Sequence, residues 1–289
     1  MIKKKKIKFS IISPAIRTEN WLKIYNSVIS DNISFEMIFA GPRKPNFKLP
    51  RNFKYIKTNV KPAQCWEILY KKARGKYIMN IGDDYIFKTE KPLKILSREL
   101  SSIKEKKILL GLRYIFRNID QTKMLTIKIN NNETESELLP MSPPLKKKLW
   151  YKYGRFDSRF ICTLMDGDFF LRMVKDGYKV KHSAVIISEE EKLEDNRKMS
   201  RDYMRLDQKL IIKLWTKKVK DKLIFTKERN EPVKNYKTKT LMAISEEPCG
   251  RWNNNNKIYN LIITSRVFYY LNIFYYARLR LYKIKKYFT

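Results

Sequence analysis

The chain has 289 residues, of which 43% are hydrophobic, and 63 Lys and Arg against 29 Asp and Glu give it a formal charge of +34. This length and apolar content exclude an intrinsically disordered protein, because the chain can bury a substantial core. The three cysteines lie far apart without a C-x-x-C pair, which excludes a disulfide framework and a zinc site and favours a reducing compartment. The sequence has no run of about 18 uncharged apolar residues, so it predicts no transmembrane helix.

The excess of basic residues has two explanations, and the sequence leaves both open. A charge of +34 attracts phosphates and anionic lipid head groups at low salt. The lysines are dispersed, however, and a composition rich in Lys, Ile and Asn spreads them over every exposed face without a specific partner.

Short apolar strands alternate with helices through the first third of the chain. The patterns predict strands at residues 7–13, 35–40, 54–58 and 76–81, and helices at residues 18–30 and 65–72, the second ending at Gly75. This alternation predicts an α/β fold with a mostly parallel sheet flanked by helices. Because ligands bind at the carboxyl ends of parallel strands, the loops after residues 13 and 81 should be neighbours in one crevice.

The following part of the chain continues with both element types. We expect helices at residues 92–104, 168–177 and 197–220, and strands at residues 108–116, 123–129 and 178–187. Gly177 is the expected end of the helix at 168–177.

Two acidic turns lie at the ends of predicted elements. Asp83 and Asp84 follow the strand at 76–81, and Asp166 and Asp168 open the helix at 168–177. A Mg²⁺ or Mn²⁺ ion on a diphosphate needs only one or two protein carboxylates, and it neutralises charge on the leaving group. A second carboxylate can take the proton from an attacking hydroxyl. The pair of turns therefore favours metal-assisted transfer from a nucleotide diphosphate.

Each turn also has a purely structural interpretation. Gly-Asp-Asp is ordinary β-turn chemistry after a strand. Asp166 can cap the helix that follows, with Asp168 stabilising the first turn through the helix dipole.

Three segments, in this order, resemble the family-two glycosyltransferases of GT-A fold: FSIISPAIRTENWLKIYNSV, PAQCWEILYKKARGKYIMNIGDDYIF and YGRFDSRFICTLMDGDFFLRMVKDGYKV. They are similar to the opening strand and turn of the nucleotide pocket, to the strand that delivers the D-x-D motif, and to the catalytic turn with its helix. The resemblance runs from about Phe9 to Val185. It implies an enzyme that transfers a sugar from a nucleotide-sugar donor to a glycan or lipid-linked acceptor, with inversion in a single displacement.

The resemblance also implies roles for individual residues. Pro14 and Ala15 match the positions that contact the base of the nucleotide sugar, and Asp83 is assigned to the same donor site. Asp84 matches the metal-binding Asp of D-x-D, with Mn²⁺ or Mg²⁺ as the implied cofactor. Asp166 matches the catalytic base.

The sequence departs from the family pattern beside these residues. Gly82 stands where the first Asp of D-x-D is expected, and Ala40 and Gly41 replace the usual Asp residues after the second strand.

We therefore predict a GT-A domain at residues 1–215 and a basic, aromatic, helical extension at residues 216–289. The extension ends in LIITSRVFYYLNIFYYARLRLYKIKKYF, whose aromatic and basic residues suit a helix in the interface of an anionic membrane. A helix packed on the catalytic domain is the alternative. The expected location is the cytoplasm, with peripheral contact to the inner face of the membrane.

Two other functions compete with glycosyl transfer. A degenerate, non-catalytic relative would only bind a partner or a membrane, and the absent first Asp motivates this alternative. A nucleic-acid-binding protein would account for the charge, but the sequence has no zinc finger, RNP-type motif or dense basic helix, so we expect no specific nucleic acid.

Overall fold

The computed structural model describes residues 6–29, 32–58, 60–116, 118–122, 126–130, 133–189 and 198–236. All of them lie in one compact unit, Met1–Gly250, while a second unit, Arg251–Thr289, lies outside the described residues. The predicted membrane-interface helix falls in that second unit. Among the described residues, no helix combines the length and apolar character needed to cross a membrane.

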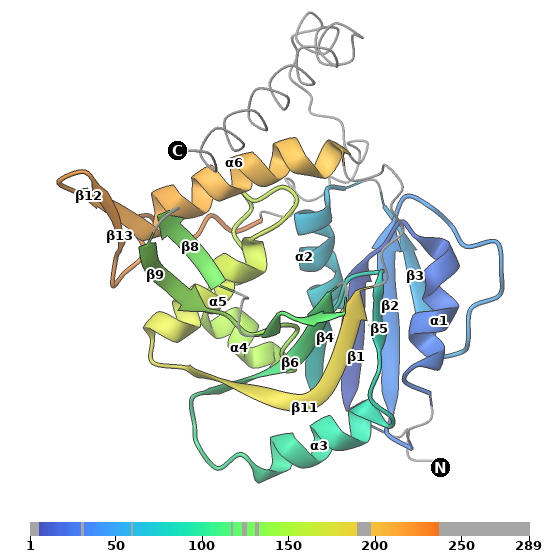
Figure 1. Cartoon of the computed structure of the whole chain (residues 1–289). Helices are drawn as coiled ribbons and strands as arrows, with labels where there is room; N and C mark the ends of the chain where they lie inside the picture. The colour runs from blue at the N-terminus through green and yellow to red at the C-terminus, as the bar shows by residue number, and fades with distance from the viewer. Residues whose placement is uncertain are drawn as a thin grey trace, which may run out of the picture. The chain divides into compact units, whose positions relative to one another are not determined.

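The first sheet has the mostly parallel architecture that the sequence predicts (Figure 1). Its strands follow the order β10-β4-β1-β2-β3. β1 (Phe9–Pro14), β2 (Phe35–Gly41), β3 (Phe53–Lys57) and β4 (Tyr77–Asn80) are parallel, and the short β10 (Leu145–Lys146) is antiparallel to β4. The connections are the 3-10 turn η1 (Thr18–Asn20), α1 (Trp21–Asn26) and α2 (Pro62–Lys72). The carboxyl ends of β1 and β4 therefore lie side by side, as expected.

A second, mixed sheet follows the order β5-β11-β6-β7. It contains β5 (Tyr85–Phe87), β6 (Ile108–Phe116), β7 (Ile119–Asp120) and the long β11 (Lys179–Glu189), and α3 (Pro92–Ser102) contacts β11. The strand predicted at 123–129 is β8 (Thr126–Asn130), which pairs with β9 (Glu133–Leu138) in a separate hairpin. β11 runs antiparallel to β5, so its end returns to the acidic turn after β4.

The compact unit continues past residue 215. After α4 (Lys147–Lys152) and α5 (Met165–Lys175), α6 (Lys198–Trp215) ends five residues before the predicted end of its helix at 220. A hairpin of β12 (Thr216–Val219) and β13 (Lys222–Phe225) follows. The backbone then returns to the unit, where Ser158 N–H donates to the Lys234 carbonyl at 2.7 Å. Residues 216–236, assigned above to the extension, are thus part of the same unit.

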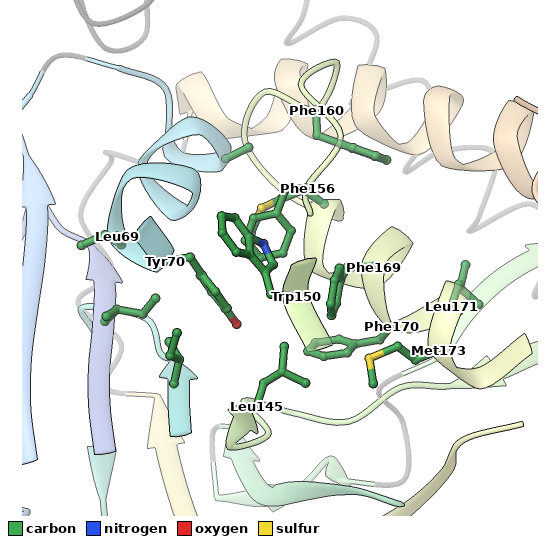
Figure 2. Packing of buried hydrophobic residues seen from close by; sticks show 14 of the residues in the cluster. Leu69, Tyr70, Leu145, Trp150, Phe156, Phe160, Phe169, Phe170, Leu171 and Met173 are labelled. Atoms are coloured by element: carbon green, nitrogen blue, oxygen red, sulfur yellow. The ribbon is translucent and has the colours of Figure 1, made fainter. Parts of the chain in front are cut away.

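Two hydrophobic cores lie on opposite faces of the first sheet. Phe9, Ile11, Met37 and Phe39 contribute to the core beneath α1 and α3, whereas even-numbered neighbours on the same strands contribute to the other. This alternation follows from the two-residue period of a strand. The second core is rich in aromatic rings from α2, α4, α5 and the loop between α4 and α5, shown in Figure 2: Tyr70, Trp150, Phe156, Phe169 and Phe170.

Of the two glycines predicted to end helices, Gly177 follows its helix as expected and Gly75 has a different role. Gly177 has a φ of +87°, the left-handed conformation expected after α5. Gly75 does not adopt a positive φ, and α2 ends earlier, at Lys72. A Cβ on Gly75 would lie 2.5 Å from the backbone nitrogen of Ser10, so the position requires glycine because two backbones approach closely.

Candidate functional site

The loop after β1 and the turn after β4 are joined through Asp83. Its carboxylate accepts hydrogen bonds from the backbone N–H groups of Ile16, at 2.6 Å, and Arg17, at 2.7 Å. Asp83 is 3% exposed, and charge-assisted bonds of this kind are short and strong where water is excluded. The structure therefore brings together the two loops that the sequence placed in one crevice.

Arg17 is a site residue that the sequence analysis did not single out. Its guanidinium donates to Asp83 and lies 3.3 Å from the carboxylate of Asp84. Burial works to lower the pKa of Arg17, but the charges of Asp83 and Asp84 outweigh it and raise that pKa. The side chain stays 26% exposed, so it offers a cation at the edge of the turn. Its partners lie 66 and 67 residues later in the chain, and no local motif marks them.

Asp84 differs from Asp83 in its surroundings. Its side chain is 12% exposed and accepts no backbone hydrogen bond from the loop after β1. Burial, together with the smaller effects of the charges of Asp83 and Glu189, raises the pKa of Asp84 to about 6 against the opposing effect of Arg17. Glu189 ends β11, where it pairs with Tyr85 of β5. It is a second acidic neighbour that the sequence analysis missed, because its place depends on how β11 pairs.

The two glycine departures from the family pattern have local steric causes. A Cβ on Gly41 would lie 1.9 Å from the carbonyl oxygen of Ala15, so no side chain fits between β2 and the loop after β1. A Cβ on Gly82 would lie 2.4 Å from Oδ1 of Asp84. The Tyr85 ring lies 3.1 Å from the same point, so the Asp84 carboxylate and this ring occupy space that Gly82 leaves open.

Pro14 and Ala15 lie at the carboxyl end of β1, at the start of this loop. Pro14 pairs with Ala40 of β2 and is partly buried, and the Ala15 N–H donates to the Ala40 carbonyl at 2.8 Å. Ala15 is 1% exposed, so both its backbone and its side chain are buried in this structure.

Asp166 is the second residue of α5. The N-cap position, which was the structural alternative for Asp166, belongs instead to Leu164, and no side chain caps the helix there. Oδ1 of Asp166 accepts the N–H of Gly167 at 2.9 Å. Asp166 as a whole is partly exposed, but the dense packing around its carboxyl group still raises the pKa of Asp166. Its negative charge in turn contributes to the raised pKa of Tyr70 on α2, after the larger effect of burial.

The two acidic turns are separate in the part of the chain that the structure describes, where no hydrogen bond or ion pair joins Asp166 to Asp83 or Asp84. They share an indirect connection through α2. This helix begins after β3, at the carboxyl edge of the sheet, and the N–H of Ala63 in its first turn donates to the carbonyl of Ile161 at 3.1 Å. The loop before Asp166 is thereby tied to the edge that carries Asp83 and Asp84.

The β-turn interpretation of the first acidic site also holds, since Tyr85 N–H donates to the Gly82 carbonyl at 3.2 Å. A turn geometry does not exclude a ligand role.

The first turn offers a limited donor set for a divalent cation. Within the described residues, no group of three or more His, Cys, Asp or Glu side chains is arranged to hold a metal ion. Asp83 is occupied by Arg17 and the loop backbone, so Asp84, which lies 3.3 Å from the same guanidinium, is the more accessible carboxylate. One carboxylate fits a Mg²⁺ or Mn²⁺ ion that takes its other ligands from diphosphate oxygens and water, and it does not fit an all-protein cage.

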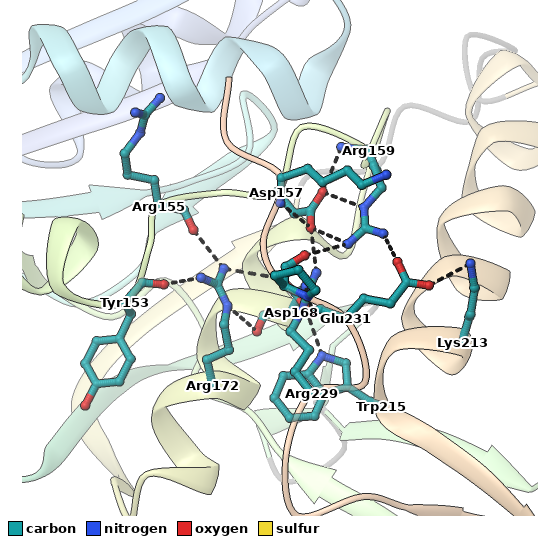
Figure 3. Close-up of polar contacts among 12 residues, drawn as sticks. Tyr153, Arg155, Asp157, Arg159, Asp168, Arg172, Lys213, Trp215, Arg229 and Glu231 are labelled. Atoms are coloured by element: carbon teal, nitrogen blue, oxygen red, sulfur yellow. Dashed lines mark hydrogen bonds and ion pairs between the residues drawn. The ribbon is translucent and has the colours of Figure 1, made fainter. Parts of the chain in front are cut away.

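A buried ionic network surrounds the first turn of α5 (Figure 3). Asp168 is 0% exposed, and its Oδ1 accepts hydrogen bonds from Trp215 Nε1 and Arg229 Nε, each at 2.8 Å. Its Oδ2 lies 3.2 Å from the guanidinium of Arg172. Arg229 also donates to Asp157 at 2.6 Å. The predicted helix-dipole role of Asp168 is thus a minor part of what this carboxylate does.

A surface depression of about 440 Å³ lies elsewhere, between the end of α3 and the start of β11. It includes His182, the single histidine, and contains none of the predicted site residues: its lining is Glu99, Ser102, Ile103, Lys104, Glu105, Leu110, Lys181 and His182. Since β11 runs away from it toward Glu189, this depression is separate from the acidic turns.

Comparison with known proteins gave matches only among solved structures; no protein-family model and no curated protein matches the sequence. S. aureus TarS 1-349 aligns with a TM-score of 0.48 and 15% identity, covering 70% of this chain and 64% of that one. Its complex with UDP gives 0.48 and 14%, with the same coverage. The complex with UDP-GlcNAc gives 0.45 and 14%, covering 70% and 65%. This chain thus spans less than two thirds of the TarS fragment.

Proposed function

We propose that this protein transfers a sugar from a nucleotide-sugar donor to a glycan or lipid-linked acceptor. The observation that carries the proposal is the set of bonds from Ile16 and Arg17 to Asp83. They join the loop with Pro14 and Ala15 to the acidic turn at the carboxyl edge of a parallel sheet, where α/β proteins bind nucleotides. The order of the three family-two segments in the sequence supports the same function.

In this proposal the donor lies against the loop after β1. The loop that begins with Pro14 and Ala15 lies beside the base, and Asp83 holds this loop in place through Ile16 and Arg17. Asp84 would hold a Mg²⁺ or Mn²⁺ ion, whose chemistry there is neutralisation of charge on the leaving diphosphate. The exposed part of Arg17 adds a fixed positive charge at the same place.

Asp166 acts as the general base. It takes the proton from the acceptor hydroxyl as that oxygen bonds to the anomeric carbon and the bond from this carbon to the diphosphate breaks. One displacement inverts the configuration. Because packing raises the pKa of Asp166, the carboxylate is a stronger base than an exposed Asp, and activity should fall as the pH drops through that raised pKa.

The test is turnover by the full chain with a panel of UDP-, GDP-, dTDP- and CDP-linked sugars, glycan and lipid-linked acceptors, and either Mn²⁺ or Mg²⁺. We expect release of a nucleoside diphosphate with at least one donor, and a loss of at least about 1,000-fold in kcat for Asp166→Asn. Asp176→Asn, at the exposed end of the same helix, is the matched control and should keep its activity. No turnover across the panel, or an unaffected Asp166→Asn, would contradict the proposal.

A non-catalytic role remains the competing function, and calorimetry separates the two. The enzyme should bind a nucleoside diphosphate more tightly with Mn²⁺ than with EDTA, whereas a protein that only binds a partner or membrane should bind none. The proposed cytoplasmic location rests on the pattern of cysteines, and the proposed peripheral membrane contact rests on residues beyond 236. Fractionation of cells that express the full chain tests both.

A further inference from the structure

One buried carboxylate from α6 holds the loop that leads into the Asp166 turn through hydrogen bonds. Asp207 accepts hydrogen bonds from the backbone N–H groups of Ile161, at 3.0 Å, and of Cys162 and Thr163, at 2.8 Å each. It is 1% exposed. Three consecutive N–H groups that converge on one oxygen pair form an anion-binding concavity, and here the chain fills it with its own side chain. The backbone of residues 161–163 is therefore fixed relative to α6.

The next residue is held in an unfavourable conformation. Leu164 has a φ of 60° and a ψ of −1°, in the left-handed region that a residue with a branched side chain avoids. Such a conformation persists where the surrounding structure over-determines it. Asp207 fixes the three residues before Leu164, and the bond from Asp168 N–H to the Leu164 carbonyl, at 2.8 Å, begins α5 after it. Leu164 thus sets the direction in which α5 starts, two residues before Asp166.

The other side of Asp166 is held by the chain after β13. Arg229, whose side chain is 7% exposed, bridges Asp168 of the first turn of α5 and Asp157 of the preceding loop (Figure 3). Trp215, the last residue of α6, donates to the same oxygen of Asp168. These contacts fix the backbone just after Asp166, while Asp207 fixes it just before.

We infer that Asp207 and Arg229 are positioning residues for the Asp166 turn, so that the segment from α6 to residue 236 completes the reaction centre. The inference rests on the proposed function, because it takes Asp166 as the base. A base has to lie within hydrogen-bond reach of the proton that it abstracts, and a displacement of about 1 Å can reduce the rate about 100-fold. Neither residue needs to touch the substrate to have this effect.

The main experiment is Asp207→Asn in the full chain. Asparagine keeps the shape of the side chain and one acceptor oxygen. Its NH2 group, however, replaces the second oxygen and is itself a donor, so it cannot accept the hydrogen bonds from the backbone N–H groups that this oxygen had accepted. We expect kcat to fall about 10- to 100-fold, while the KM for the donor stays within about two-fold, because the turn at Asp83 and Asp84 is untouched. Asp207→Ala should lower kcat further, since it removes both acceptors.

The matched control is Glu36→Gln. Glu36 is also a buried carboxylate, 1% exposed, and it also accepts a backbone N–H, from Arg74 at 2.7 Å, together with the Ser10 hydroxyl at 2.8 Å. It braces the start of β1, far along the chain from the α5 turn. Both variants should lower the unfolding midpoint, but only Asp207→Asn should lower kcat. An equal loss of kcat in both, or none in either, would overturn the inference.

Amide hydrogen exchange separates this inference from the proposed function. In Asp207→Asn, residues 161–166 should exchange at least 10-fold faster, while residues 77–84 keep the wild-type rate. If the wild-type chain turns over no nucleotide sugar, the proposed function fails, and exchange still decides whether Asp207 holds the turn. Unchanged exchange at residues 161–166, or a uniform increase over the whole chain, would show that it does not.

Discussion

The turn at Asp83 and Asp84 is held by a loop that precedes it in the chain, whereas the turn at Asp166 is held mainly by segments that follow it. In the first, backbone N–H groups from the loop after β1 meet one carboxylate, and Arg17 provides a single cation. In the second, the support comes from α6 and from the chain after β13, through several buried ions. The first arrangement is a product of sheet topology, and the second depends on long-range pairing of charges. Removal of one charged side chain should therefore lower the stability of the protein more at the Asp166 turn than at the turn of Asp83 and Asp84.

The largest expected effect comes from Arg229→Met. This change leaves the 0%-exposed carboxylates of Asp157 and Asp168 each without one cation partner. Removing one member of a buried ion pair typically costs about 3–5 kcal/mol, and we expect a loss of about 4 kcal/mol in the free energy of unfolding. Urea denaturation measures it.

The control for Arg229→Met is Arg113→Met, which breaks an ion pair with Asp120 in which both side chains are more than 40% exposed. Its loss should be below about 1 kcal/mol. Equal losses in the two variants would contradict the expected dependence of the Asp166 turn on its buried ions.

An intermediate effect should appear in acid. Burial works to raise the pKa of Asp157, but hydrogen bonds from Arg159 and Arg229 lower it to about 2, below the ordinary value of 3.8. A carboxyl group with a lowered pKa in the folded state stabilises the protein above its unfolded pKa, and this contribution disappears as the pH falls from about 4 to about 2. The shift corresponds to about 2 kcal/mol.

Urea denaturation of the wild type and of Asp157→Asn between pH 6 and pH 2 isolates this contribution from that of other carboxylates. The difference in free energy of unfolding between the two proteins should narrow as the pH falls below 4. A difference that stays constant with pH would mean that Asp157 is not held as an anion by its arginine partners.

The smallest changes in the free energy of unfolding should come from substitutions in the turn at Asp83 and Asp84. The changes at these two residues should have opposite signs. Asp83→Asn loses the charge that Arg17 and two N–H groups engage, and should destabilise the protein by about 1 kcal/mol. Asp84 has a pKa raised to about 6, so its charged form is unfavourable at pH 8. With EDTA present, Asp84→Asn should therefore be neutral or stabilising by up to about 1 kcal/mol. Thermal unfolding of both variants at pH 8 makes the comparison, and destabilisation by Asp84→Asn would contradict the assigned difference.

The sequence predicts the first sheet and the meeting of its loops because these follow from local patterns. Apolar runs mark β1, β2 and β4, and parallel strands bring their carboxyl ends to one edge whatever the side chains there. It does not predict which carboxylate of the Asp83–Asp84 pair is occupied, since that depends on the direction of the N–H groups of Ile16 and Arg17. Nor does it place β6 and β8 in different sheets, because their residue patterns look alike.

The residues that hold the Asp166 turn, Asp207 and Arg229, are harder to predict from the sequence. Asp207 lies 44 residues beyond Thr163, on a helix whose period identifies its buried face but not the partner of a buried carboxylate. Arg229 lies in a segment without helix or strand period. Only the packed structure shows that Asp207 is 1% exposed and bonded to backbone N–H groups. It likewise shows that Arg229 is 7% exposed and paired with the buried Asp157 and Asp168.

The return of residues 226–236 to α5 also bears on how this protein can be cut or recombined. A recombinant chain that stops after α6, where the helical pattern suggests a natural break, would keep every residue of the two acidic turns. It would still lack Arg229 and the backbone at Lys234 that accepts a hydrogen bond from Ser158. Asp157 and Asp168 would then lie buried with fewer counter-charges. Any transferable module of this protein extends at least to Lys234, and gene fusions or swaps joined earlier would carry the two acidic turns without all the contacts that hold them.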